Sequence, residues 1–341
     1  MKKSVVLLLT LIISFQLKSQ DLSELFEKVS GSVVLINTTE KEIAGGGSHG
    51  HVVTNEGLGS GVLISEDGTI LTAAHVVQLA ENIEVIFKDG QKIPAKQVGT
   101  DNIADVAMIK LMWPPKNPTV AKLGDSEKVK VGERIFVIGS PYGLNQSLSS
   151  GYISGKHKKK AMGGGLTLME FFQTDAAINQ GNSGGPMFNM QGDIIGIVSY
   201  ILSMSGGFQG LGFAATSNIA KSILIDQKSG WTGMESTFVS GELARIFNLP
   251  QSGAVYVQKV ASLSPADIAG LKGGVYKSTI EGEDVLLGGD FILEIEGIKM
   301  VNENSLIELH KIVEPKNKGD KLALKVLRGG KIIDMTYILP N

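Results

Sequence analysis

Short apolar segments separated by turn residues run through the first two thirds of the chain. Segments such as 33–36 and 135–138 are bounded by polar residues or glycine and are too short for helices of ordinary length. Apolar runs of this kind are typical of buried strands joined by tight turns. The pattern predicts strands at 32–36, 61–65, 69–70 with the run that follows, 83–87, 134–138 and 193–198. Ahead of them, helical spacing is found for Leu22, Leu25, Phe26 and Val29.

The strand-rich region divides into two halves of comparable size. Pro114-Pro115 and the segment 122–125 separate the halves, and 225–230 follows them as a linker. Two β-barrels with the functional groups across their seam are the economical architecture for such a region. The predicted fold class is therefore mostly β, with a double barrel over residues 21–228.

The pattern changes to mixed helices and strands from residue 231 to residue 341. A short helix is predicted to start at Ser264 with Pro265 in its first turn, and 304–313 carries apolar residues on one face. The segment 274–287 has the character of an insertion. This part is predicted to be a separate α/β domain, with strands at 254–257, 290–295 and 322–327.

Residues 1–20 are predicted to form a signal peptide. Lys2 and Lys3 precede an apolar run at 4–15 that is short for a membrane span, and cleavage near Ser19-Gln20 is plausible. Export to the bacterial periplasm is the favoured location. An uncleaved membrane anchor at the N-terminus is the alternative.

Composition narrows the chemistry. The chain has no cysteine, which excludes a cysteine nucleophile, thiolate metal sites, disulfides and a lipoprotein anchor. The formal net charge is −2, and it becomes about −5 when the lysines of the leader are removed, so nucleic acid is not expected as a partner. We expect no metal and no cofactor.

The segment Gly181-Asn182-Ser183-Gly184-Gly185-Pro186 carries the strongest chemical signal in the chain. It places a serine hydroxyl between glycines, where backbone N–H groups can converge beside it. Acyl transfer needs such a nucleophile together with donors for the oxyanion. His75 and Asp105 lie upstream, and the order His, Asp, Ser is that of chymotrypsin-type enzymes. The sequence therefore predicts a peptidase triad.

The same glycines also match G-x-S-x-G, the nucleophile elbow of α/β-hydrolases. In that fold the histidine follows the serine, whereas the only later histidine is His310 in the separate C-terminal domain. The elbow also needs a helix directly after the serine, but Pro186 begins a predicted strand and turn. The elbow interpretation fails on both points.

The triad assigns each group a role. Ser183 attacks the carbonyl, His75 takes its proton and later delivers it to the leaving amine, and Asp105 orients the imidazole. The backbone N–H groups of Gly181 and Ser183 form the predicted oxyanion hole, with the N–H of Asn182 as a third donor.

These motifs resemble the HtrA/Deg family of serine proteases. The similarity rests on segments 59–62, 71–77, 105–107, 173–186 and 210–214, and it extends from about Asp21 to the C-terminus. Gln180 and Ala215-Thr216 depart from the family pattern, away from the triad. The C-terminal part resembles a PDZ domain at 262–271 and 288–292. The resemblance implies a trypsin-like double β-barrel followed by an α/β PDZ domain at 231–341, with a homotrimer as the basic unit.

The resemblance also implies two binding sites. Ala177 stands where trypsin-like enzymes keep the carboxylate of the S1 pocket, so an apolar pocket is predicted, and cleavage after Val, Ala or Ile. A carboxylate-binding loop that captures hydrophobic C-terminal peptides is predicted in the PDZ domain. The S1 residues are Ala177, Ile178, Ile201 and Leu202, and the loop residues are Thr232, Gly233, Met234 and Glu235.

The expected function is an ATP-independent serine endopeptidase of the cell envelope that degrades unfolded or damaged proteins. Two alternatives are a chaperone or binding scaffold with a weak or resting peptidase, and a signalling protease that cleaves one membrane partner. The basic run Lys156–Lys160 is predicted to be a solvated loop, at the position of the family's sensor loop.

Overall fold

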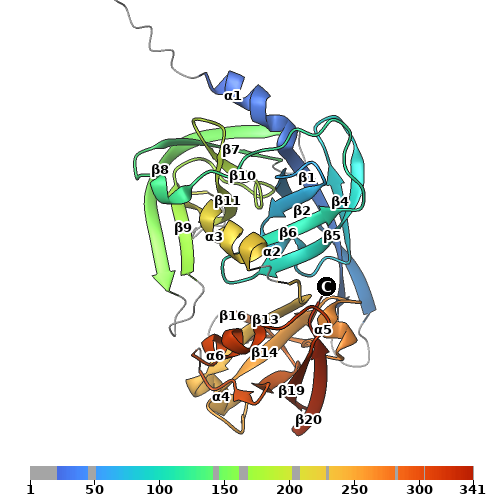
Figure 1. The fold of residues 1–341 in the computed structure, drawn as a ribbon. Helices are drawn as coiled ribbons and strands as arrows, with labels where there is room; N and C mark the ends of the chain where they lie inside the picture. Colours follow the sequence, from blue (N-terminus) through green and yellow to red (C-terminus); the bar gives the residue numbers. More distant parts are fainter. Residues whose placement is uncertain are drawn as a thin grey trace, which may run out of the picture.

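The computed structural model describes residues 21–44, 51–140, 146–160, 168–201, 208–227, 230–280, 283–302 and 304–340. The predicted signal peptide lies outside these residues. Figure 1 shows two barrels side by side, with the C-terminal domain against one end of them. The mostly β fold class, a double barrel followed by a further domain, is confirmed.

The first barrel follows helix α1 (Leu22–Val29), whose N-terminus is capped by the Asp21 carboxylate. The barrel closes in the strand order β1-β2-β3-β6-β5-β4 around a core of aliphatic side chains. The short helix α2 (Ala74–Val77) follows β3. The strands are β1 (Val33–Ala44), β2 (His51–Leu63), β3 (Thr69–Thr72), β4 (Asn82–Ile86), β5 (Lys92–Asp101) and β6 (Val106–Leu111).

The second barrel repeats the plan of the first. Its strand order is β10-β11-β12-β9-β8-β7, and its own core includes Phe172 and Met187. A further core cluster joins side chains of both barrels and α1, including Val29, Leu71 and Phe136. The strands are β7 (Arg134–Gly139), β8 (Ser147–Lys160), β9 (Leu168–Thr174), β10 (Pro186–Asn189), β11 (Ile194–Ile201) and β12 (Gly212–Thr216).

The predicted linker is helical at its start. Helix α3 (Ser217–Ala220) continues into the helical segment η5 (Lys221–Asp226), which covers the first residues of 225–230. The C-terminal domain then folds as a sheet in the order β13-β14-β17-β19-β20, with β18 paired to β17. Its elements are β13 (Met234–Ser240), α4 (Gly241–Ile246), β14 (Gly253–Val260), α5 (Pro265–Ile268), β17 (Phe291–Ile295), β18 (Ile298–Lys299), α6 (Asn304–Val313), β19 (Lys321–Arg328) and β20 (Lys331–Ile338).

Local sequence signals fix several of these elements. The predicted helix at Ser264 is confirmed, because the Ser264 hydroxyl accepts the N–H of Asp267 and Pro265 occupies the first helical position. The helix at 304–313 is confirmed as α6. The inserted segment forms a two-stranded hairpin of β15 (Tyr276–Ile280) and β16 (Glu283–Leu287).

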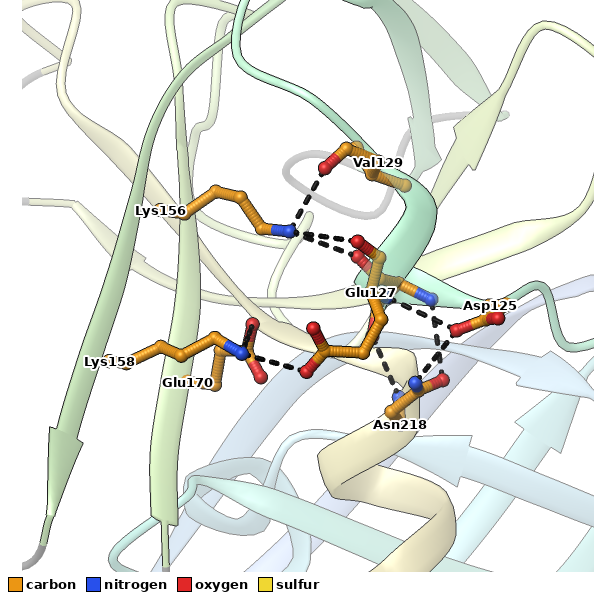
Figure 2. Close-up of polar contacts among 8 residues, drawn as sticks. Asp125, Glu127, Val129, Lys156, Lys158, Glu170 and Asn218 are labelled. Carbon is orange, nitrogen blue, oxygen red and sulfur yellow. Dashed lines mark hydrogen bonds and ion pairs between the residues drawn. The ribbon is translucent and has the colours of Figure 1, made fainter.

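The prediction of a solvated loop at Lys156–Lys160 is wrong. These residues form the end of β8, paired to β9 from Lys156↔Phe172 to Lys160↔Leu168. Lys156 Nζ donates to the carbonyl of Val129 at 2.9 Å and lies 5.4 Å from the ring centroid of Phe172. Lys158 Nζ lies 2.7 Å from a carboxylate oxygen of Glu127. A dashed line marks this contact in Figure 2. Lys156 and Lys158 thus make specific contacts within the second barrel, and a run of charged residues in the sequence does not reveal such contacts.

Candidate active site

His75 lies in α2, directly after the strand β3 of the first barrel. Its Nδ1 lies 3.0 and 2.9 Å from the two carboxylate oxygens of Asp105, and its backbone N–H donates to the same carboxylate at 3.0 Å. A carboxylate only accepts hydrogen bonds, so the proton of the neutral ring is on Nδ1. Nε2 is therefore the nitrogen that can accept a proton.

The Asp105 carboxylate changes the basicity of the imidazole. Burial lowers the pKa of His75, but the hydrogen bond and the negative charge of Asp105 outweigh that effect, and the net pKa is above its ordinary value. A raised pKa means that the imidazolium form is stabilised. That form is the one that arises when the ring removes a proton from a hydroxyl.

A strained turn between β5 and β6 presents Asp105. The residue has a φ of 51°, a left-handed conformation that is uncommon outside glycine. Asp101 holds the turn, because its carboxylate accepts the N–H of Ile103 at 3.0 Å and of Ala104 at 2.8 Å.

Ser199 joins the two barrels at this point, and sequence reasoning missed it. Its hydroxyl donates to Asp105 Oδ2, and its backbone carbonyl accepts from Ser183 Oγ at 3.4 Å. The sequence signal that could have found it is a serine inside the apolar segment 194–201, which forms β11 and in which Ser199 is 1% exposed. Buried hydroxyls need a partner, so such a serine points to a polar group across the seam.

The serine loop brings Ser183 to the first barrel. The carbonyl of Ser183 accepts the N–H of Ser60 at 2.8 Å. A Cβ on Gly184 would collide with Thr72 Oγ1 and the carbonyl of Ser60, so only glycine allows this approach. Among the described hydrogen bonds, none joins Ser183 Oγ to the His75 ring. Catalytic hydrogen bonds often tighten only when substrate is bound.

The backbone beside Ser183 has two N–H groups to offer. Gly181 has a φ of 98°, and within the described residues neither the N–H of Gly181 nor that of Ser183 has a hydrogen-bond acceptor. Such donors suit a developing oxyanion. The prediction of a third donor at Asn182 is wrong in this arrangement, because that N–H donates to the carbonyl of Asn179 at 3.0 Å.

The predicted S1 residues are brought together only in part. Ile178 is 3% exposed and lies in the core of the second barrel, with Ile201 packed against the same cluster. Ala177 is exposed, and its carbonyl accepts the hydroxyl of Ser149 at 2.9 Å. Leu202 lies outside the described residues. The apolar S1 pocket stays a prediction.

A cleft of about 250 Å³ opens beside the imidazole, and the C-terminal domain forms part of its wall. His75, Asp105 and Gln78 line it from the first barrel, while Glu235 and Lys259 come from β13 and β14. The second domain therefore reaches the surroundings of His75 and Asp105.

The predicted carboxylate loop lies at the same boundary. Its first half is a turn, in which Gly233 has a φ of 68°, while Met234 and Glu235 already belong to β13. Within the described residues, the N–H groups of Thr232 and Gly233 have no acceptor. The carbonyl of Met234 accepts the side-chain amide of Gln78 at 2.6 Å.

Gln78 also receives a hydrogen bond at its backbone. It follows directly after α2, and its carbonyl accepts Trp231 Nε1 at 2.9 Å. The last carbonyls of a helix have no partner within the helix, so an outside donor satisfies one of them here. The helix that carries His75 is therefore bonded to the segment that opens the C-terminal domain.

Two protein families match segments of this chain. Residues 59–197 match the trypsin-like peptidase domain and residues 234–339 match the PDZ domain. The chain thus combines a trypsin-like peptidase domain with a PDZ domain. The chain belongs to the HtrA/Deg family of serine proteases.

Individual relatives agree with this assignment. The chain is 38% identical over 282 residues to a "Probable periplasmic serine endoprotease DegP-like" of Pseudomonas putida, covering 81% of this chain and 54% of that protein. It is 35% identical over 291 residues to the "Periplasmic pH-dependent serine endoprotease DegQ" of Escherichia coli, covering 83% and 59%. The chain thus spans little more than half the length of these curated relatives.

Solved structures resemble the whole chain. "HtrA-type protease AlgWS227A with decapeptide" superposes with a TM-score of 0.56 at 29% identity, covering 94% of this chain and 97% of that one. In the part of the chain that the structure describes, no helix has the length and apolar character needed to cross a membrane.

Proposed function

We propose that this chain is a serine endopeptidase in which Ser183 is the nucleophile, His75 the general base and Asp105 the group that orients the imidazole. The observation that carries the proposal is the set of hydrogen bonds that connects the two barrels at this site. Asp105 fixes the His75 tautomer, and Ser199 bonds both Asp105 and Ser183. The N–H groups of Gly181 and Ser183 hold the oxyanion.

The proposed substrates are unfolded or damaged proteins of the bacterial cell envelope. The names of the relatives, periplasmic serine endoproteases, support an exported enzyme. The proposed S1 pocket is apolar, with Ala177, Ile178, Ile201 and Leu202 as its residues, and it would favour cleavage after Val, Ala or Ile. A Lys or Arg side chain there would bury a charge without a partner. The proposed assembly is a homotrimer.

The PDZ domain is proposed to bind hydrophobic C-terminal peptides at Thr232–Glu235. Within the described residues the N–H groups of Thr232 and Gly233 have no acceptor, and this supports the role, since backbone nests of this kind hold a terminal carboxylate. The bonds between Gln78, Trp231 and Met234 support an influence of the bound peptide on the catalytic helix.

The direct test is the Ser183→Ala variant with reduced, unfolded casein as substrate. Removing the nucleophile should leave no cleavage above background, because the remaining groups cannot form an acyl-enzyme. Circular dichroism and thermal unfolding should match the unaltered protein, which shows that the loss is chemical. Cleavage by Ser183→Ala at the original rate would contradict the assignment. Binding of casein without cleavage by the unaltered protein would favour a chaperone.

A further inference from the structure

The side chain of Ser60 connects β2 of the first barrel to the serine loop of the second barrel. Ser60 is completely buried, with 0% of its surface exposed. Its hydroxyl oxygen accepts the N–H of Ser140 at 2.9 Å, so its single proton is left for another acceptor. That acceptor is the carbonyl of Gly181, which lies 2.6 Å from the Ser60 hydroxyl. One buried hydroxyl thus bonds a peptide group of the loop that carries Ser183.

The backbone of Ser60 bonds the same loop a second time. Its N–H donates to the carbonyl of Ser183 at 2.8 Å, and the carbonyl of Asn182 between them accepts the N–H of Gly185 at 2.9 Å. The peptide group that carries the Ser183 N–H therefore lies between two peptide groups that Ser60 holds. Because a peptide group is planar, a donor that fixes the direction of its carbonyl also fixes the direction of its N–H.

Gly181 needs such an external restraint more than other residues do. It has a φ of 98°, and a residue without a side chain can rotate about both backbone bonds at little cost. In the part of the chain that the structure describes, the N–H groups of Gly181 and Ser183 have no acceptor, so no bond of their own fixes them. Their direction depends on the bonds that the neighbouring carbonyls make, and the Ser60 hydroxyl supplies the bond directly after Gly181.

We propose that Ser60 is a positioning residue whose hydroxyl holds the Gly181 carbonyl, so that the N–H groups of Gly181 and Ser183 converge on one oxyanion. Ser60 cannot contact the substrate, because it is completely buried. It acts through the loop alone. The proposal rests on the proposed peptidase function and assigns to the first barrel a part in forming the oxyanion hole. Oxyanion donors act when negative charge develops on the substrate, so the effect belongs to kcat and not to KM.

The experiment measures the kinetics of Ser60→Ala with a fluorogenic peptide. We expect kcat to fall by about 30-fold, because both donors shift from their best positions, while KM stays within about twofold. A peptide aldehyde provides a second measurement. Ser183 Oγ adds to its carbonyl carbon, and the former carbonyl oxygen occupies the oxyanion hole. The inhibition constant of the aldehyde should therefore rise by about the same factor as kcat falls.

A matched control separates positioning from a general loss of stability. Ser217 in α3 is also a buried serine, 1% exposed, whose hydroxyl donates to a backbone carbonyl, that of Gly124 at 2.8 Å. Ser217→Ala should lower the melting temperature about as much as Ser60→Ala and leave kcat unchanged. Ser60→Cys fills the space of the hydroxyl with a thiol that donates only weakly. It should lower kcat at least tenfold, and it carries the same comparison if Ser60→Ala does not fold.

The outcomes distinguish this proposal from the proposed function. If the unaltered protein cleaves neither the peptide nor casein, the peptidase assignment fails. If it cleaves them and the folded Ser60 variants keep kcat within threefold, the positioning role is overturned. Unchanged affinity for the aldehyde would overturn it as well. Calorimetry with the substrate peptide compares Ser183→Ala with the double variant that adds Ser60→Ala. The two affinities should agree within about twofold, and a larger difference would mean that Ser60 acts on substrate binding instead.

Discussion

Two segments of the molecule present backbone N–H groups beside a glycine of positive φ, and they are supported differently. At Gly181–Ser183 the loop is braced by backbone of the first barrel, through Ser60 and the close approach of Gly184. At Thr232–Gly233 the turn is bonded to its own domain, and its neighbour Met234 is bonded to Gln78 beside the catalytic helix.

The difference matters because the two segments are proposed to hold different anions. The oxyanion exists only during the reaction, in the tetrahedral intermediate and the transition states beside it, so its donors must be in place beforehand and must not move. A terminal carboxylate is a stable ligand, and its binding can alter the contacts of a segment shared between domains. A rigid support therefore suits the oxyanion site at Gly181–Ser183. A support shared between the two domains suits the carboxylate site at Thr232–Gly233.

Of the variants that test this comparison, Asp105→Asn is expected to lower peptidase activity the most. Asp105→Asn keeps the shape of the side chain but favours the wrong imidazole tautomer, and kcat should fall by about 10⁴. The rate is measured with a fluorogenic peptide, and Glu84→Gln serves as the control, because Glu84 is an exposed carboxylate of the same barrel that pairs with Lys92. Loss of less than tenfold would show that Asp105 does not orient the imidazole.

This outcome depends on residues that the sequence identifies well. His75, Asp105 and Ser183 lie in short sequence motifs, so their candidate roles can be recognised without a tertiary structure. The strands and the helices at Ser264 and 304–313 follow from apolar spacing and from caps, which are local properties.

The residues that sequence reasoning missed depend on pairing over long distances. Ser199 acquires its position from the register shift of β11 against β12 between Val198 and Ile201, and the apolar segment around Ser199 does not reveal that shift. Lys156 and Lys158 look like loop residues in sequence because the carbonyl of Val129 and the carboxylate of Glu127, their partners, are far away in the chain. The N–H of Asn182 is not free to bind an oxyanion, because it donates to the carbonyl of Asn179 in a turn that the sequence does not predict.

A second prediction breaks the support of the serine loop without touching the triad. In Gly184→Ala the new Cβ would lie 2.8 Å from the backbone N of Ala73 and collide with Ser60, at a φ of 81°. The loop must shift, and loss of the oxyanion donors should lower kcat/KM by about 100-fold. The fall in kcat/KM is measured by cleavage of a short peptide. The affinity of the PDZ domain for C-terminal peptides should be unchanged.

The matched control is Gly132→Ala, where φ is 91° and no atom lies within 4 Å of the added Cβ. It carries the backbone strain without the collision and should cost only about 1 kcal/mol of stability. Equal activity of the two variants would mean that the close approach of Gly184 to the first barrel does not position the nucleophile.

A smaller effect is expected at the second segment. In Gly233→Ala the new Cβ would collide with the side chain of Ser264 and lie 3.0 Å from the ring of Trp231, at a φ of 68°. We expect about tenfold weaker binding of a hydrophobic C-terminal peptide, because the N–H groups of the turn lose their alignment. Cleavage of a short peptide without added ligand should change by less than about threefold.

Calorimetry with the free-acid peptide and its C-terminal amide sharpens this prediction. The unaltered protein should bind the acid in the micromolar range, about −7 to −8 kcal/mol, and the amide clearly more weakly. Equal affinity for the two forms would contradict the carboxylate loop. Unchanged cleavage rates at saturating acid peptide would limit the PDZ domain to holding substrates.

The central claim, that Ser183 is made nucleophilic by the His75–Asp105 pair, is tested most directly by active-site labelling. A fluorophosphonate probe is incubated with the full chain, and mass spectrometry of the digest identifies the modified residue. The account predicts one adduct, on Ser183, absent from Ser183→Ala and formed far more slowly in Asp105→Asn. An adduct on another serine, or casein cleavage by protein whose Ser183 stays unlabelled, would contradict it.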